Sequence, residues 1–274
     1  MVANVRLDHA VINVGFRMDV AQALFTNLGF KLTPRGFHST GSINHLAMFG
    51  ADYLELIGLP KWGTHERPDI ANAPAGVNGI VFKTDDVNAT YTHLQNANFH
   101  SEGPKSFSRL VNLDNGTYQA KFQTVTVRSE IFAGGRVYFC EHGTPELIWR
   151  PEWQSHSNGA EAIPEIIVVS STPNTEADNF AKLLNGENIV GKIAFDGGNI
   201  TVVSQTQYSE RYEALASSMK NRDSIFGCLV LQTNNRGYLN EMLDNGIEGL
   251  ETQIEKLRTL VRIPAFDALI EFID

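Results

Sequence analysis

Three segments decide the fold: LDHAVINV at 7–14, MDVAQALFTNLGF at 18–30 and DYLELIG at 52–58. The first and third are short and apolar, which is typical of strands. The second places Val20 and Leu24 on one face of an amphipathic helix. A further β-rich segment, HLAMFG, lies between the helix and the third segment. Together they predict a β-α-β-β-β unit.

The order of strand and helix returns three more times along the chain. NGIVFKT, EIIVVSS and GCLVLQT each precede a helical pattern, and β-rich segments follow each helix. A sheet of three or four strands with one helix exposes an apolar face, so such units are expected to pair. The pattern predicts an α+β protein of paired units with mixed sheets and helices outside.

A polar linker separates the second unit from the third. Residues 150–164, RPEWQSHSNGAEAIP, lack apolar periodicity and have linker composition. The predicted domains are therefore 1–156, with two units, and 157–274, with two degenerate units.

Composition narrows the class of protein. The chain has 42% hydrophobic and 19% charged residues and a net charge of −9, without basic clusters. Nucleic acid is therefore not an expected partner. No apolar run reaches the roughly 18 to 20 residues needed to cross a bilayer, and no export signal is visible. Two cysteines fit a reducing setting, so we expect a cytoplasmic protein without a membrane partner.

Acidic residues recur near the ends of the units. Glu55 in YLELI aligns with Glu146 in TPELI, and Glu271 occupies a similar place in the fourth unit. His9 is likewise embedded in an apolar strand. Because a buried carboxylate is costly without a partner, these residues are candidates for a site. The structural alternatives are that His9 is a hydrogen-bonded core residue and that Glu146 caps a turn after Pro145.

The chain resembles the vicinal oxygen chelate superfamily, and most of all its glyoxalase-like domain branch. The resemblance is carried by D-H-A-V at 8–11, L-G-F at 28–30, Y-L-E-L-I at 53–57 and YFCEHGTPELIWRPEW near the end of the second unit. It implies a glyoxalase/bleomycin-resistance/dioxygenase-like fold. In that superfamily two units form a cupped, incomplete barrel that holds a divalent metal.

The resemblance implies particular metal ligands. His9 and Glu55 would bind from the first unit and Glu146 from the second. Asn78-Gly79 stands where the metal enzymes of the superfamily place a fourth ligand. His142 is a candidate replacement, with a structural or substrate-contacting role as the alternative. This donor set suits Zn, Ni, Mn or Fe(II) without selecting among them.

Other residues are candidates for substrate binding. Asn44 and His45 lie in GSINHLAMFG, which resembles a loop pattern of the branch and could bind a polar group of the ligand. Tyr53 and Trp149 could line the pocket, although aromatic residues on strands are usually core.

Two functional hypotheses follow. The first is a glyoxalase-like metal-dependent enzyme (lyase, isomerase or dioxygenase type) that acts on a small oxygen-chelating substrate, with Glu146 moving a proton. The second is a non-catalytic protein of the same fold that sequesters a small molecule. The missing second-unit ligand favours sequestration, and the pairing of His9 with Glu55 favours the enzyme. A homodimer is expected to be possible in either case.

Overall fold

The computed structural model describes residues 5–62 and 67–274. It contains two eight-stranded mixed sheets. The first has the strand order β2-β3-β4-β1-β5-β8-β7-β6. Its strands are β1 (Leu7–Gly15), β2 (Gly36–Phe37), β3 (Ile43–Met48), β4 (Tyr53–Gly58), β5 (Gly76–Lys83), β6 (Lys105–Leu113), β7 (Gly116–Val127) and β8 (Arg136–His142).

The second sheet repeats this arrangement, with the order β10-β11-β12-β9-β13-β16-β15-β14. Its strands are β9 (Ala160–Ser170), β10 (Asn188–Ile189), β11 (Lys192–Phe195), β12 (Gly198–Val203), β13 (Ser224–Thr233), β14 (Glu251–Ile254), β15 (Arg258–Ile263) and β16 (Ala268–Ile273). The helices are α1 (Met18–Asn27), α2 (Pro68–Ala71), α3 (Val87–Asn96), α4 (Pro173–Leu184), α5 (Gln205–Tyr212) and α6 (Arg236–Asp244).

Each sheet consists of two four-stranded units joined through their first strands. In the first sheet β1 runs parallel to β4 and β5 runs parallel to β8, while β1 and β5 pair antiparallel. In the second sheet β9 and β13 make the same antiparallel junction. The predicted fold class, paired units in cupped mixed sheets with helices outside, is confirmed.

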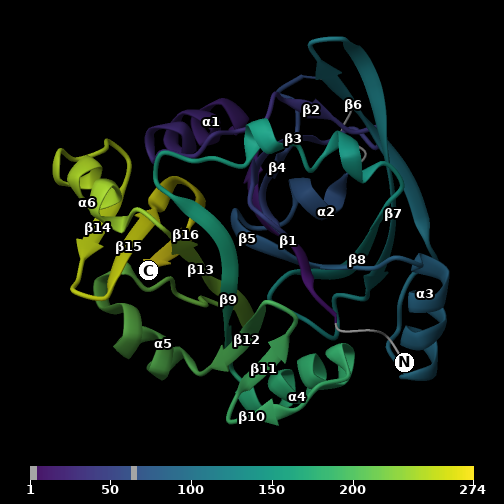
Figure 1. The fold of residues 1–274 in the computed structure, drawn as a ribbon. Coiled ribbons are helices and arrows are strands. Elements are labelled where there is room, and N and C mark those ends of the chain that lie inside the picture. The colour runs from purple at the N-terminus through teal and green to yellow at the C-terminus, as the bar shows by residue number, and fades with distance from the viewer. Residues whose placement is uncertain (1–4, 63–66) are drawn as a thin grey trace.

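One apolar core joins the convex faces of both sheets. It includes Ile12 of β1, Phe25 of α1, Phe180 of α4 and Phe226 of β13, all buried. At the junction Gly135 lies so close to Phe226 that a Cβ there would be 2.7 Å from the ring. Figure 1 shows the two sheets side by side with α1 and α4 along their outer surfaces. Because the two halves share this core, the division into domains at 156/157 stays a prediction.

Two short helices, which the sequence did not predict, lie on the concave sides instead. Ile70 of α2 packs inside the first sheet. Tyr208 and Tyr212 of α5 are completely buried inside the second sheet, against Ile167 and Cys228. The second cup is therefore filled by the chain itself, whereas the first holds mostly side chains of its own strands.

The first sheet curls until its two edge strands meet. His38, next to β2, bridges Arg109 of β6, and the Ser39 amide donates to the Ser108 carbonyl at 2.8 Å. Figure 1 places β2 and β6 together at one end of this sheet. The first cup is thus nearly closed.

The end of the second unit differs from the sequence prediction. The last strand is β8, which ends at His142, and residues 144–148 are not a strand. Pro145 begins a short 3-10 helix, η1 (Pro145–Leu147), and Glu146 is exposed on it. Proline lacks an amide N–H and fixes φ, which favours a helical start over a sheet position here. The strand alignment of Glu146 with Glu55 is therefore wrong.

No helix among residues 5–62 and 67–274 is long and apolar enough to cross a membrane.

Candidate functional site

His9 and Glu55 face each other in the concave side of the first sheet. The parallel register pairs His9 with Tyr53 and Val11 with Glu55, so His9 and Glu55 are diagonal neighbours on one face. Both are at least 95% buried, and His9 Nε2 lies 3.7 Å from Glu55 Oε2. Two ligand atoms each about 2.1 Å from one ion lie at most about 4.2 Å apart. This pair can therefore share an ion without moving.

Asp8 joins the same cluster because β1 is irregular at this point. The pairing of β1 with β5 shifts register between Leu7 and His9, and such a bulge allows consecutive side chains to reach one side. The His9 Nδ1 donates to Asp8 Oδ1 at 2.6 Å, and His142 Nε2 donates to the same oxygen at 3.0 Å. The Asp8 carboxylate thus bridges two imidazoles.

The charge state of Asp8 follows from these partners. Burial alone would raise the pKa of this carboxyl, but the charge of His142 and hydrogen bonds from both imidazoles hold the pKa well below its ordinary value. Since His9 Nδ1–H is committed to an ionised Asp8, His9 Nε2 presents its lone pair to the cup. Tyr138 of β8 donates to this nitrogen from 3.4 Å.

Glu55 is held as a carboxylate by a different set of groups. Burial raises the pKa of Glu55, but electrostatic interactions with the imidazoles of His9 and His38 and a hydrogen bond from Asn44 outweigh burial, so that the net pKa is below its ordinary value. Asn44 Nδ2 donates to Glu55 Oε1 at 2.7 Å. This bond leaves Glu55 Oε2 directed toward His9. The site therefore offers one imidazole nitrogen and one carboxylate oxygen, which suit a divalent transition metal.

A second group of ligating atoms lies on the other side of Asp8. Atoms of Asp8, Cys140 and His142 all lie within 4.8 Å of one another. Burial raises the pKa of the Cys140 thiol well above its ordinary value, so the thiolate that metals prefer is disfavoured. His142 Nδ1 is buried without a hydrogen-bond partner in the described part of the chain. This group is a possible metal site beside the His9 and Glu55 pair.

The structure places most of the predicted substrate-binding residues in the cup. Asn44 contacts Glu55, and the Tyr53 ring stacks on His9 with centroids 4.4 Å apart. The Trp149 ring lies 5.7 Å from Tyr53 and 4.7 Å from His142. These aromatic rings form one wall of the cup.

Two predicted residues lie elsewhere. His45 alternates with Asn44 along β3 and faces the other way, where its ring contacts the Thr33 carbonyl at 2.7 Å and Arg35 at 3.2 Å. Glu146 is exposed on η1, and the described residues include no contact between it and His9 or Glu55. The structure therefore does not bring Glu146 to the pair.

Sequence reasoning missed Asp8, Tyr138 and Arg109, all of which lie at or next to the cup. Asp8 was within the quoted motif, but in a regular strand it would face away from His9. A charged residue next to a histidine inside an apolar strand was the one available signal.

The corresponding acid of the second cup is already satisfied by protein groups. Glu271 Oε2 accepts hydrogen bonds from Tyr212 at 2.7 Å and from Arg211 at 2.9 Å. Arg211 also pairs with Glu165 at 3.4 Å. A guanidinium from α5 thus supplies the positive charge beside this carboxylate.

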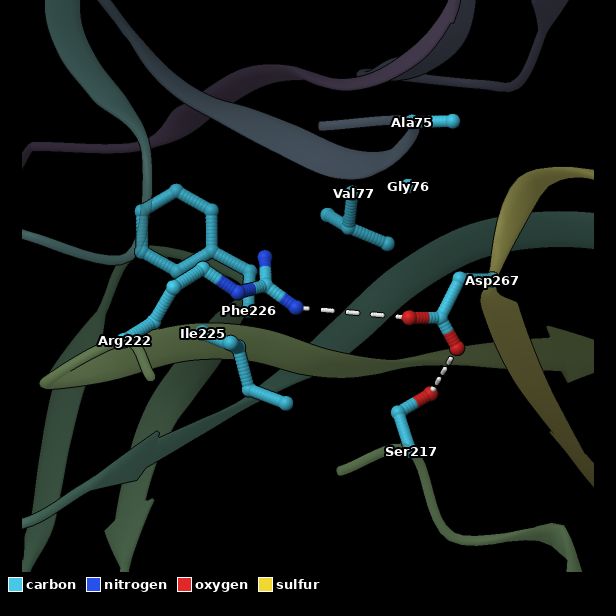
Figure 2. Close-up of a pocket in the computed structure, with 8 residues that line it drawn as sticks. All are labelled: Ala75, Gly76, Val77, Ser217, Arg222, Ile225, Phe226 and Asp267. Carbon is cyan, nitrogen blue, oxygen red and sulfur yellow. Dashed lines mark hydrogen bonds and ion pairs between the residues drawn. The ribbon is translucent and has the colours of Figure 1, made fainter. Parts of the chain in front are cut away.

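Two hollows lie outside the cup. Figure 2 shows the smaller, between the two sheets, where Asp267 accepts from Ser217 at 2.8 Å and pairs with Arg222 at 4.0 Å. Its volume of about 10 Å³ is room for about one water. The larger, about 250 Å³, is a surface groove next to α1 that Phe37 and Trp62 help to line. Neither is lined by His9 or Glu55.

Paired β-α-β-β-β units around a buried histidine and glutamate define the class of protein. A sequence profile of the glyoxalase-like domain matches residues 7–184. The chain therefore belongs to the glyoxalase-like domain family. The match runs from β1 through the end of α4, and no curated protein matches the chain.

Solved structures share the fold at low sequence identity. A hypothetical protein from Staphylococcus aureus is 13% identical, with 98% of each chain covered and a TM-score of 0.66. A mutant of 4-hydroxymandelate synthase from Streptomyces coelicolor is 11% identical over 98% of this chain and 92% of that one, with a TM-score of 0.58. A xylose isomerase-like TIM barrel/4-hydroxyphenylpyruvate dioxygenase fusion protein is 11% identical over 99% of this chain and 49% of that one, with a TM-score of 0.57.

Proposed function

We propose that the protein is a metal-dependent enzyme whose divalent ion binds between His9 and Glu55 in the first cup. The observation that carries the proposal is the 3.7 Å separation of two buried ligand atoms from adjacent strands. Asp8 accepts a hydrogen bond from His9 Nδ1 and so fixes the tautomer of His9 in which Nε2 is free to bind a metal. Zn, Ni, Mn and Fe(II) all accept this donor pair.

The chain's own residues divide the remaining work. A bound ion would supply Lewis-acid polarisation of substrate oxygens. Asn44 orients Glu55, and Asp8 orients His9. Burial raises the pKa of Tyr138 far above neutrality, so its hydroxyl stays protonated and donates a hydrogen bond at His9 Nε2. This hydroxyl can turn to a substrate oxygen once Nε2 is engaged.

The proposed substrate is a small molecule with adjacent oxygens that chelate the ion. Two protein ligands leave positions for both oxygens on an ion with four to six ligands. The name of one structure with this fold, a dioxygenase fusion protein, supports a reaction of the dioxygenase type beside the lyase and isomerase types. The homodimer stays a prediction.

A second candidate function rests on the aromatic wall. Tyr53, Trp149 and Phe122 surround the His142 ring with centroid distances of 6.4, 4.7 and 5.1 Å. Such a wall also suits a protein that sequesters an organic molecule without a metal.

The test is metal binding by two matched variants. Protein purified without chelator is analysed for metal, and the stripped protein is titrated calorimetrically with Zn, Ni, Mn and Fe(II). Glu55→Gln should weaken binding sharply, because the amide keeps the shape and loses the charge. Glu146→Gln, an equal change at an exposed glutamate, should bind as wild type does. A wild-type protein that binds none of the four ions, or a Glu55→Gln variant that binds equally well, would overturn the proposal and leave sequestration.

A further inference from the structure

Arg109 is a buried guanidinium that makes no ion pair with the residues that the structure describes. It lies on β6 at the seam where the two edges of the first sheet meet, and it is 4% exposed. Its Nη1 donates a long hydrogen bond of 3.4 Å to Asn44 Oδ1. Its Nε and Nη2 are buried with no hydrogen-bond partner among the described residues. Arginine keeps its charge in proteins, so this site carries an unsatisfied positive group.

The carboxylates around the cup are engaged by other residues. Asp69 pairs with Arg67 at 2.7 Å and with Arg136 at 3.4 Å. Glu55 accepts from Asn44 and faces His9. In the described ranges no ion pair reaches Arg109. Buried charges without partners are costly, so an anion bound at this group would relieve that cost.

The two unpaired donors lie on one edge of the guanidinium plane. Nε–H and the adjacent Nη2–H point in nearly parallel directions and form the fork that binds two oxygens of a carboxylate or a phosphate. The backbone opposite leaves space for the arginine, because a Cβ on Gly36 would lie 2.5 Å from Arg109 Cδ and 2.3 Å from Asn44 Oδ1. The absence of a side chain at Gly36 therefore makes room for Arg109.

A chain of side-chain contacts links Arg109, through its Nη1, to the proposed metal pair. Arg109 contacts Asn44, Asn44 contacts Glu55, and Glu55 faces His9. Asn44 is the one side chain that these contacts place between Arg109 and Glu55.

We propose that the Nε and Nη2 edge of Arg109 binds an anionic group of the substrate, either a carboxylate or a phosphate. The link to catalysis rests on the proposed function. The anion binding itself needs no metal, so the two can be tested separately.

The experiment titrates the metal-stripped protein in EDTA with acetate, inorganic phosphate and acetamide, the last a neutral analogue of acetate. Two-dimensional nitrogen–proton NMR follows the Arg109 Nε–H resonance. A saturable shift with acetate or phosphate, and none with acetamide, is expected. The stronger of the two anions identifies a carboxylate or a phosphate on the substrate.

Three variants show whether Arg109 is the binding group. Arg109→Gln should weaken anion binding at least about tenfold, because a charge-assisted pair is lost. Arg109→Lys should weaken it too, because an ammonium keeps the charge and loses the fork. Arg128→Gln, at an exposed arginine, should bind as wild type does. If both Arg109 variants fail to fold, the wild-type comparison of acetate with acetamide still decides.

The inference is overturned if neither anion gives a saturable shift, or if Arg109→Gln binds the anion undiminished. Failure of anion binding in a protein that binds metal overturns this inference alone. Failure of metal binding in a protein whose Arg109 binds anions overturns the proposed function alone.

Discussion

Replacing Asp8 with Asn is expected to destabilise the protein by about 3 kcal/mol at neutral pH. Asp8 is fully buried and accepts hydrogen bonds from His9 and His142. Removing one partner from a buried charged cluster costs about 3–5 kcal/mol. The lower end applies because the Asn oxygen can still accept from both imidazoles, so the main loss is that of the negative charge.

The pH dependence of this loss has a definite sign. The folded-state pKa of Asp8 lies below the ordinary value of 3.8. Its contribution to the free energy of unfolding is therefore complete above that value and is lost as pH falls from there through the folded pKa. The difference between wild type and Asp8→Asn should be constant near neutrality and shrink in acid.

The assay is urea unfolding of both proteins at neutral pH and along an acid series. Metal affinity is measured on the same samples and should fall about 10- to 100-fold, because Asp8 orients the ligand His9. A destabilisation below about 1 kcal/mol, or a difference that does not shrink in acid, would refute the assignment of Asp8 as the ionised bridge. Unchanged metal affinity would refute its role behind His9.

Two further predictions concern buried groups outside the metal pair. Asp52 lies at the contact with β9, where burial raises its pKa to about 7 and one carboxylate oxygen has no partner in the described structure. The protein therefore loses stability as pH rises from 3.8 through about 7, because Asp52 must ionise while buried. In urea unfolding, Asp52→Asn should stabilise the protein by about 1–3 kcal/mol at pH 8 and not at pH 5. Equal effects at both pH values would contradict this. Tyr212→Phe should cost about 1.5–3 kcal/mol, because Glu271 loses a buried hydrogen bond of 2.7 Å. Thermal unfolding checks it, and an unchanged melting temperature would show that α5 does not hold the second cup through this bond.

The sequence by itself determined the repeated unit and the first half of the site. The periodicity of four strand and helix pairs was enough for the fold class, because hydrophobic patterning fixes which faces must be covered. His9 and Glu55 could be paired from sequence, since both are polar residues inside apolar strands. For this pair, the regular geometry of a strand and the family resemblance were enough to predict that both side chains share one site.

Only the tertiary structure decided how the site is completed. Asp8 reaches the cup through an irregularity in β1 that no local pattern signals. Glu146 leaves it because Pro145 starts a helical turn where sequence alignment continued a strand. Arg109 belongs to it because the first sheet curls until β6 meets the segment after β2. These outcomes depend on register, curvature and edge closure, which arise from contacts between residues far apart in the chain.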